Sequence, residues 1–150
     1  APIGTRVFGC DVCQEVCPFN GSVTPRARAP ELTPRPELDL VDLISLLELG
    51  AAGYRKLAKR TALRRATRVT LARNAAVALG NTHDARAAEP LARALRAHSS
   101  SLVRGHAAWA LGELGVACGS TGREALGEAA RTDTDPNVRE EAAVALARLS

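Results

Sequence analysis

The sequence predicts a mostly α-helical protein, in which a short cysteine loop precedes an α-solenoid built from helix pairs. Hydrophobic residues make up 46% of the 150 residues while aromatic residues make up only 3%, which favours closely packed helices over a β-sandwich. An alanine-rich segment occurs three times, starting at residues 75, 107 and 142, and such a period is typical of a solenoid. No apolar run reaches the ~18 residues that a membrane span needs, so no membrane association is expected.

Three of the four cysteines lie close together near the start of the chain, at Cys10, Cys13 and Cys17. Their spacing, C-x2-C-x3-C followed by Pro18, matches the last three cysteines of the bacterial ferredoxin run, and soft thiolates suit iron–sulfur clusters. Val7 stands where the first cysteine of that run would be, so the remaining ligands must come from elsewhere. The sequence therefore predicts these three cysteines as iron–sulfur ligands.

Zinc is the main alternative metal, but zinc sites favour a C-x2-4-C unit with a second Cys or His pair at a distance. The three histidines, His83, His98 and His106, show no such pairing. Cys118 lies far downstream, and we expect a small buried residue there. The clustered cysteines suit a reducing compartment better than a disulfide scaffold, which predicts a cytoplasmic protein.

The chain divides into three regions. Residues 1–20 hold the cysteine loop and would form the C-terminal part of a ferredoxin-like domain. Residues 21–37 contain four of the eight prolines, a density that argues against a long regular element and predicts a connector. Residues 38–150 would form the helical domain, which begins with an amphipathic helix over 38–49 that ends at Gly50.

Two helices are expected after Gly50. A short basic helix would lie near 54–60. A longer helix would cover 62–79, with Thr61 as its N-cap and an end at Gly80-Asn81.

All of the excess positive charge lies in residues 49–83, which carry eight basic and no acidic side chains in a chain of net charge +4. Such a block needs a counter-charge, either a nucleic-acid backbone, solvent or the acidic residues of another domain. Arg64, Arg65 and Arg68 would lie in the first two turns of the expected long helix, where cations oppose the helix dipole and a bound phosphate would relieve them. Within the basic segment 54–73, the predicted nucleic-acid-binding residues are Lys56, Lys59, Arg60, Arg64, Arg65 and Arg68.

The second and third alanine-rich copies are each preceded by another expected helix, over 87–97 and 122–131. Pro90 suits the first turn of the former. Thr121 and Glu124 have the spacing of a capping box for the latter.

The repeat helices themselves have candidate N-caps at Ser101 and Asp135. Arg104 and Arg139 occupy equivalent positions three residues before the alanine pair, which indicates a structural role such as pairing with a turn carboxylate like that of Asp135. Trp109 aligns with valines in the other copies and is expected to fill the core. Arg73 is one position out of this frame, and the sequence leaves its role open between structure and binding.

Two stretches together carry a family resemblance: FGCDVCQEVCPFN at residues 8–20 and RNAAVALGN at residues 73–81. The helical repeats resemble HEAT repeats, and the chain as a whole resembles the C-terminal part of epoxyqueuosine reductase. Phe19 stands where many members of that family have tryptophan. The absence of methionine and the start at Ala1 also predict a piece of a longer polypeptide.

The resemblance implies that the full-length protein is a cobalamin-dependent oxidoreductase with two 4Fe–4S clusters, which converts epoxyqueuosine to queuosine in tRNA. It implies that Cys10 and Cys13 serve one cluster with upstream cysteines, and that Cys17 completes the other. The basic repeats would bind the tRNA anticodon arm, and an external donor would supply electrons to a monomeric enzyme. The cobalamin site and the catalytic acid would lie upstream, so this piece alone should be inactive.

Two other functions remain open from the sequence. One is an iron–sulfur electron-transfer module fused to a protein-docking solenoid, without nucleic acid. The other is a helical scaffold whose cysteine loop binds zinc. The basic segment favours the tRNA-modifying reductase over the electron-transfer module, and metal analysis would decide the case of the zinc-binding scaffold.

Overall fold

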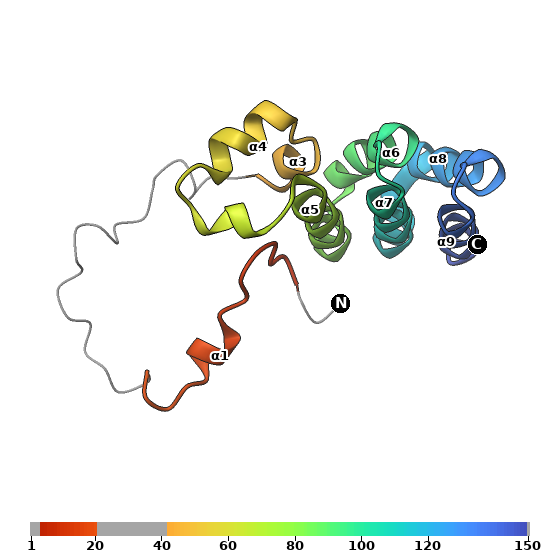
Figure 1. Ribbon diagram of the computed structural model, residues 1–150. Helices are drawn as coiled ribbons and strands as arrows, with labels where there is room; N and C mark the ends of the chain where they lie inside the picture. Colours follow the sequence, from red (N-terminus) through yellow and green to blue (C-terminus); the bar gives the residue numbers. More distant parts are fainter. Residues whose placement is uncertain (1–3, 21–41, 150) are drawn as a thin grey trace.

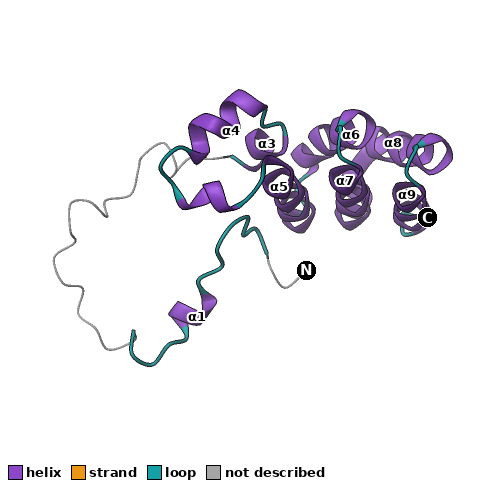
Figure 2. Ribbon diagram, viewed as in Figure 1, coloured by secondary structure: helices purple, strands orange, loops and turns teal. Residues whose placement is uncertain are grey.

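The computed structural model of the protein describes residues 4–20 and 42–149. Every regular element in these two ranges is helical, as Figure 2 shows, which confirms the mostly α-helical prediction. The expected connector at 21–37 lies outside the described residues. The α-helices are α1 (Val12–Glu15), α3 (Leu43–Leu47), α4 (Ala51–Ala58), α5 (Arg68–Thr82), α6 (Ala88–Ala97), α7 (Ser101–Leu114), α8 (Gly119–Thr132) and α9 (Pro136–Ala147).

The helices form two layers of an α-solenoid. Helices α5, α7 and α9 lie side by side in one layer, while α3, α6 and α8 form the other, and each of α3, α6 and α8 packs on the helix that completes its pair (Figure 1). The three pairs are α3–α5, α6–α7 and α8–α9. This arrangement confirms the predicted solenoid of helix pairs.

Small residues let the helices of the α5, α7 and α9 layer approach closely. A Cβ atom on Gly80 would lie 2.9 Å from the Cα atom of Ala110, and one on Gly112 would lie 2.9 Å from the Cβ atom of Ala145. Real Cβ atoms do not tolerate such contacts, so both positions require glycine. Gly80 is therefore a packing residue inside α5, and the expected helix end at Gly80-Asn81 is wrong because α5 continues to Thr82.

The expected helix over 62–79 is also wrong at its start. Residues Ala62–Arg65 form a separate 3₁₀ turn, and α5 begins at Arg68 after Thr67, whose hydroxyl accepts a hydrogen bond from the amide of Thr70. Between them, Ala66 is extended and buried, and its carbonyl oxygen accepts a 2.7 Å hydrogen bond from the hydroxyl of Tyr54. This tertiary contact explains why the chain breaks at Ala66.

The N-cap predictions had mixed outcomes. Asp135 caps α9 through the amide of Asn137, as expected. Ser101 is the first residue of α7 rather than its cap. Thr121 lies inside α8, which begins two residues earlier at Gly119, so the expected capping box is wrong.

The helices expected at 38–49, 54–60 and 87–97 are all present with shifted bounds. Asp42 caps α3 through the amide of Ser45, and α3 ends at Leu47, while residues 38–41 lie outside the described ranges. Helix α4 begins three residues earlier than expected. Pro90 lies in the first turn of α6, as expected.

The first helix pair differs from the other two in how its helices are joined. Only residues 98–100 separate α6 from α7, and only residues 133–135 separate α8 from α9. The α3–α5 pair is instead joined by residues 48–67, which contain α4 and the 3₁₀ turn; we call this segment the insertion. Figure 1 shows it projecting beyond the two-layered solenoid at the end farthest from α9.

Candidate functional site

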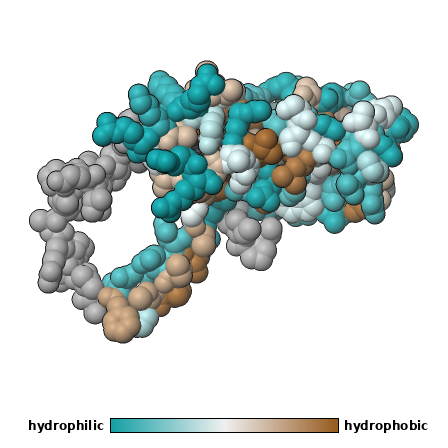
Figure 3. All heavy atoms as spheres, in the orientation of Figure 1, coloured by the Kyte–Doolittle hydropathy of each residue, from teal (hydrophilic) through white to brown (hydrophobic). Residues whose placement is uncertain are grey.

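The predicted nucleic-acid-binding residues cluster on the insertion and on the start of α5. Lys56 lies in the last turn of α4, and Arg64 and Arg65 lie in the 3₁₀ turn; all three side chains are exposed. Lys59 and Arg60 are exposed in the loop between them. Figure 3 shows the resulting hydrophilic surface over α4 and the segment that follows it.

The acidic residues that flank this block in the sequence pair with arginines outside it. No acidic residue occurs between Glu48 and Asp84. Glu48 pairs with Arg93 at 2.6 Å, and Asp84 pairs with Arg86 at 2.6 Å, so the two flanking carboxylates already have cationic partners. The insertion thus presents cationic groups whose counter-charge must come from outside this segment.

Arg68 differs from the other predicted cations. It is the first residue of α5, it is half-buried, and its guanidinium donates a 3.4 Å hydrogen bond to the carbonyl oxygen of Leu49. Arg64 and Arg65 precede the helix, so the expectation that all three arginines oppose its dipole is wrong for these two. The exposure and charge of Arg64 and Arg65 still suit phosphate binding, but the N-terminus of α5 is not part of that argument.

Arg104 is structural, as the sequence indicates, although the partner is Asp133 and not Asp135. Its guanidinium forms a bidentate pair with Asp133, with nitrogen–oxygen distances of 2.8 and 2.9 Å, and also donates to the carbonyl oxygen of His98. Arg139 donates a 2.7 Å hydrogen bond to the carbonyl oxygen of Asp133. Both arginines therefore stabilise the turn between α8 and α9, which is the structural role that the sequence indicates.

Burial lowers the pKa of His98, and the nearby charges of Arg68 and Arg104 lower it further. The amide of Ser100 donates to Nδ1 of His98, so the proton of the neutral ring lies on Nε2, which is buried without a hydrogen-bond partner. The Nε atom of Arg73 is likewise buried without a hydrogen-bond partner. The residue is half-buried, and its role stays open between structure and binding.

The cysteine segment, residues 4–20, contains α1 and three left-handed residues, Gly4 (φ 61°), Gly9 (φ 64°) and Asp11 (φ 48°). Cys10 and Cys13 are exposed, Cys17 is half-buried, and none of the three forms a disulfide. The side-chain amide of Asn20 donates to the carbonyl and side-chain oxygens of Gln14 and closes the loop around Cys17. The segment therefore displays three thiols without any other bonding partner.

These thiols fit part of a cluster site but do not complete one. No group of three or more His, Cys, Asp or Glu side chains close enough to hold a metal ion occurs among residues 4–20 and 42–149. Four large apolar side chains around the thiols are exposed, and the most exposed, Phe19, is 84% accessible. The four are Phe8, Val12, Val16 and Phe19. An exposed apolar face of this kind is typical of a surface that another protein segment covers.

The cysteine segment is attached to α5 by two asparagines. The side-chain amide of Asn74 donates a 2.7 Å hydrogen bond to the carbonyl oxygen of Val7, and that of Asn81 donates a 2.6 Å hydrogen bond to the carbonyl oxygen of Gly4. Figure 1 shows this segment passing beneath α5. This contact was not predicted from the sequence. The only signal for it is a pair of asparagines seven residues apart, a spacing that places them on one helix face.

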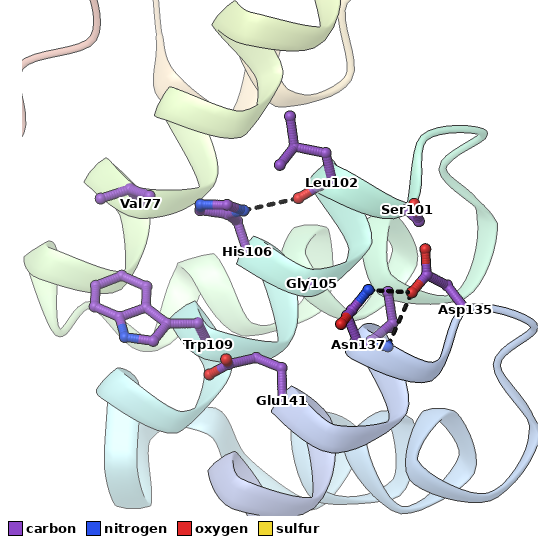
Figure 4. Close-up of a pocket in the computed structure, with 10 residues that line it drawn as sticks. Val77, Ser101, Leu102, Gly105, His106, Trp109, Asp135, Asn137 and Glu141 are labelled. Atoms are coloured by element: carbon purple, nitrogen blue, oxygen red, sulfur yellow. Dashed lines mark hydrogen bonds between the residues drawn. The ribbon is translucent and has the colours of Figure 1, made fainter.

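A pocket of about 510 Å³ opens on the face formed by α5, α7 and α9 (Figure 4). Trp109 lines it and is half-buried against the core, in line with the expected filling role. The charged side chains around it are the carboxylates of Asp135 and Glu141, and no lysine or arginine lines it. The pocket is therefore unsuited to phosphate.

Cys118 is buried, with 1% exposure, and burial raises the pKa of its thiol. A protonated buried thiol is a poor metal ligand, which confirms the expected packing role. Within the described residues, no helix is both long and apolar enough to cross a membrane.

Two curated relatives extend over most of this chain. An epoxyqueuosine reductase of Xanthomonas campestris is 35% identical over 115 residues, which are 77% of this chain and 32% of that protein. One of Bacillus cereus is 33% identical over 139 residues, which are 93% of this chain and 36% of that protein. This chain thus spans about a third of the length of these relatives.

A solved structure is similar over nearly the whole chain. It is an epoxyqueuosine reductase with a stem loop of tRNA-Tyr modified with epoxyqueuosine, with a TM-score of 0.86 and 29% identity over 98% of this chain and 38% of that chain. The resemblance to epoxyqueuosine reductases expected from the sequence is thereby confirmed. A family model described as HEAT repeats matches residues 58–147, and with its three packed helix pairs the chain belongs to the HEAT-repeat family.

Proposed function

We propose that this chain is part of a tRNA-modifying oxidoreductase that converts epoxyqueuosine to queuosine in tRNA. The observation that carries the proposal is the block of exposed cationic residues in the insertion, on a solenoid similar to that of an epoxyqueuosine reductase solved with a tRNA stem loop. The chain would contribute an RNA-binding surface and part of the iron–sulfur ligand set. Whole-protein activity needs the upstream part, so this piece alone would not turn over.

The chemistry of the insertion suits the RNA backbone. Double-stranded RNA is bound mainly through phosphates and 2′-hydroxyls, and its phosphates attract lysine and arginine. The one aromatic residue of the insertion, Tyr54, is half-buried and its hydroxyl already bonds Ala66, so it is not available for base stacking. We therefore propose that the insertion and the start of α5 bind the stem of the anticodon arm. The residues involved would be Lys56, Lys59, Arg60, Arg64, Arg65 and Arg68.

The cysteine segment would hold two clusters in part. Cys10 and Cys13 would ligate one 4Fe–4S cluster with upstream cysteines, and Cys17 would complete the second, since the fourth cysteine of a ferredoxin run ligates the other cluster. When bound, such clusters transfer single electrons. The residues of this chain would fix three thiolates in place, and the exposed apolar face around them would be covered by the upstream domain.

The remaining parts of the proposal have no residues in this chain. Cobalamin would bind in the upstream part, and an external protein would donate electrons. Oxidation-sensitive exposed thiols support a reducing compartment, the cytoplasm. We propose a monomer.

The experiment uses the full-length protein purified without oxygen. Nucleoside mass spectrometry should show loss of epoxyqueuosine and gain of queuosine in tRNA, and metal analysis should give about eight irons per chain, two clusters of four. Iron without tRNA binding would favour the electron-transfer module. Zinc in place of iron would contradict the proposal and favour a helical scaffold.

A further inference from the structure

We propose that Asn74 and Asn81 are positioning residues, which set the place of the cysteine segment relative to the RNA-binding insertion through α5. The inference rests on the proposed function for its catalytic consequence, but the attachment itself rests on the structure alone. Two hydrogen bonds carry it, from Asn74 to the carbonyl oxygen of Val7 and from Asn81 to that of Gly4.

The two contacts fix the direction of the cysteine segment relative to α5. Asn74 and Asn81 are seven residues apart on a helix, which is about 10.5 Å along its axis at 1.5 Å per residue. Asn74 contacts Val7, and Asn81, further along α5, contacts the earlier Gly4. The segment therefore runs antiparallel to α5 in a register that both hydrogen bonds satisfy together.

The asparagines hold the cysteine segment just before the point at which it becomes exposed. Residues 8–16 are exposed, and Val7 is half-buried and packs at the edge of the core. Only Phe8 and Gly9 separate the anchored Val7 from Cys10. A change in the anchor is therefore transmitted to the first thiol over a very short path.

The rest of α5 is rigidly held. Leu71, Ala75 and Ala78 in this helix are at most 1% exposed. Its first residue, Arg68, bonds Leu49 at the base of the insertion. Arg68 and Asn74 are about 9 Å apart along the helix axis. Helix α5 therefore sets the spacing between the insertion and the cysteine segment.

The equivalent positions of the other repeats lack this pair. In the alanine-rich frame, Asn74 corresponds to His106 and Glu141, and Asn81 corresponds to Glu113 and Arg148. His106 bonds Leu102 within its own helix, and Glu113 pairs with Arg148. Among the described residues of this layer, the amide pair is thus particular to α5.

Limited trypsin digestion of the full-length protein tests the attachment directly. Arg6 lies between the two anchored carbonyls, so cleavage after it requires the segment to leave α5. When opening is fast relative to cleavage, the rate reports the open population. Asn74→Ala should raise the rate by about 2- to 12-fold, the effect of one lost hydrogen bond, and Asn74→Ala with Asn81→Ala should raise it further.

Two controls accompany this measurement. Cleavage after the exposed Arg64 should be unchanged in every variant, because the insertion is untouched. Asn137→Ala, an exposed asparagine on α9, should leave cleavage after Arg6 unchanged. Asn74→Gln keeps an amide donor and should recover part of the protection.

Steady-state kinetics test the positioning role. The double alanine variant should keep its iron content and its KM for tRNA within about twofold, while kcat falls at least fivefold, since small misplacements of reacting groups are costly. Unchanged cleavage after Arg6 would overturn the proposal. Raised cleavage with unchanged kcat would also overturn it, leaving the asparagines merely structural. A full-length wild-type protein without reductase activity would overturn the proposed function, and with it this role.

Discussion

The first helix pair and the later two use their charges in opposite ways. In residues 84–149, arginines pair with carboxylates across turns and between helices, as with Arg96 and Glu128, Arg104 and Asp133, and Arg148 and Glu113. In the insertion of the first pair, six cationic side chains follow one another without an acidic residue. Arginines thus form ion pairs within the fold in the later helix pairs, whereas in the insertion they form a block of one sign.

The comparison also shows why net charge is a poor guide to binding surfaces. The whole chain carries only +4, because the paired regions contribute both signs. What distinguishes the insertion is that its sequence places six cationic residues together with no acidic residue among them. Substitution should therefore affect stability in the later pairs and affinity in the insertion.

The largest expected effect on stability is at Arg104. Arg104→Ala leaves the carboxylate of Asp133, which is 8% exposed, without its bidentate partner. Loss of one member of a largely buried pair should lower the free energy of unfolding by about 3 kcal/mol. Thermal unfolding followed by circular dichroism should show a drop of roughly 6–12 °C. The control Arg65→Ala, in the insertion, should change stability by less than about 0.5 kcal/mol; equal effects would contradict the comparison.

The packing between pairs should be the next most sensitive feature. Gly112→Ala places a Cβ atom 2.9 Å from that of Ala145, and Gly80→Ala places one 2.9 Å from the backbone of Ala110. Either change should cost about 1–3 kcal/mol through forced helix displacement. Gly127→Ala is the control, because its new Cβ atom would meet only the flexible side chain of Arg131 at 3.5 Å. Chemical denaturation would measure all three, and a Gly112→Ala protein as stable as the control would refute the close-packing account.

Acidification should weaken the later pairs in two stages. Burial lowers the pKa of His98, so the unfolded chain binds more protons below its ordinary value of about 6.5, and stability decreases as pH falls through that range. The hydrogen bond from Arg104 lowers the pKa of Asp133, so its contribution is complete above about 3.9 and is lost at lower pH.

His98→Asn isolates the first stage. An asparagine oxygen can still accept the hydrogen bond from Ser100, but it does not titrate. Unfolding midpoints between pH 7 and 5 should therefore decline less steeply in this variant. An identical pH dependence would show that His98 is not the responsible group.

The smallest effect is expected for the exposed ion pair between Arg148 and Glu113. Both side chains are partly solvated, at 48% and 30% exposure, and such pairs contribute about 0.5 kcal/mol or less. Glu113→Gln should lower the unfolding midpoint by no more than about 2 °C. A loss as large as that of Arg104→Ala would mean that burial does not decide the strength of these pairs.

Local chemistry explains which features the sequence could predict. Asp135 and Pro136 define a helix start by themselves, and the prediction there was confirmed. Thr61 and Thr67 are both suitable caps, and the choice between them depends on the Tyr54–Ala66 contact, which no local pattern reveals. The anchoring of Val7 by Asn74 spans 67 residues and is likewise invisible in sequence. The iron–sulfur role of the cysteines stays a prediction, because the described residues form no group of ligands around a metal ion.

The most direct measurement is the salt dependence of binding between the full-length protein and a tRNA anticodon stem loop. Arg64→Glu with Arg65→Glu should weaken binding and make the log–log salt slope less steep by about 1.4 to 1.8 units, since each lost phosphate contact removes about 0.7–0.9. The matched control is Arg123→Glu with Arg131→Glu, two exposed arginines on α8 with the same change in net charge. The account predicts that only the insertion variant changes the slope. Equal effects of the two variants, or none for the insertion variant, would contradict the claim that the insertion binds tRNA.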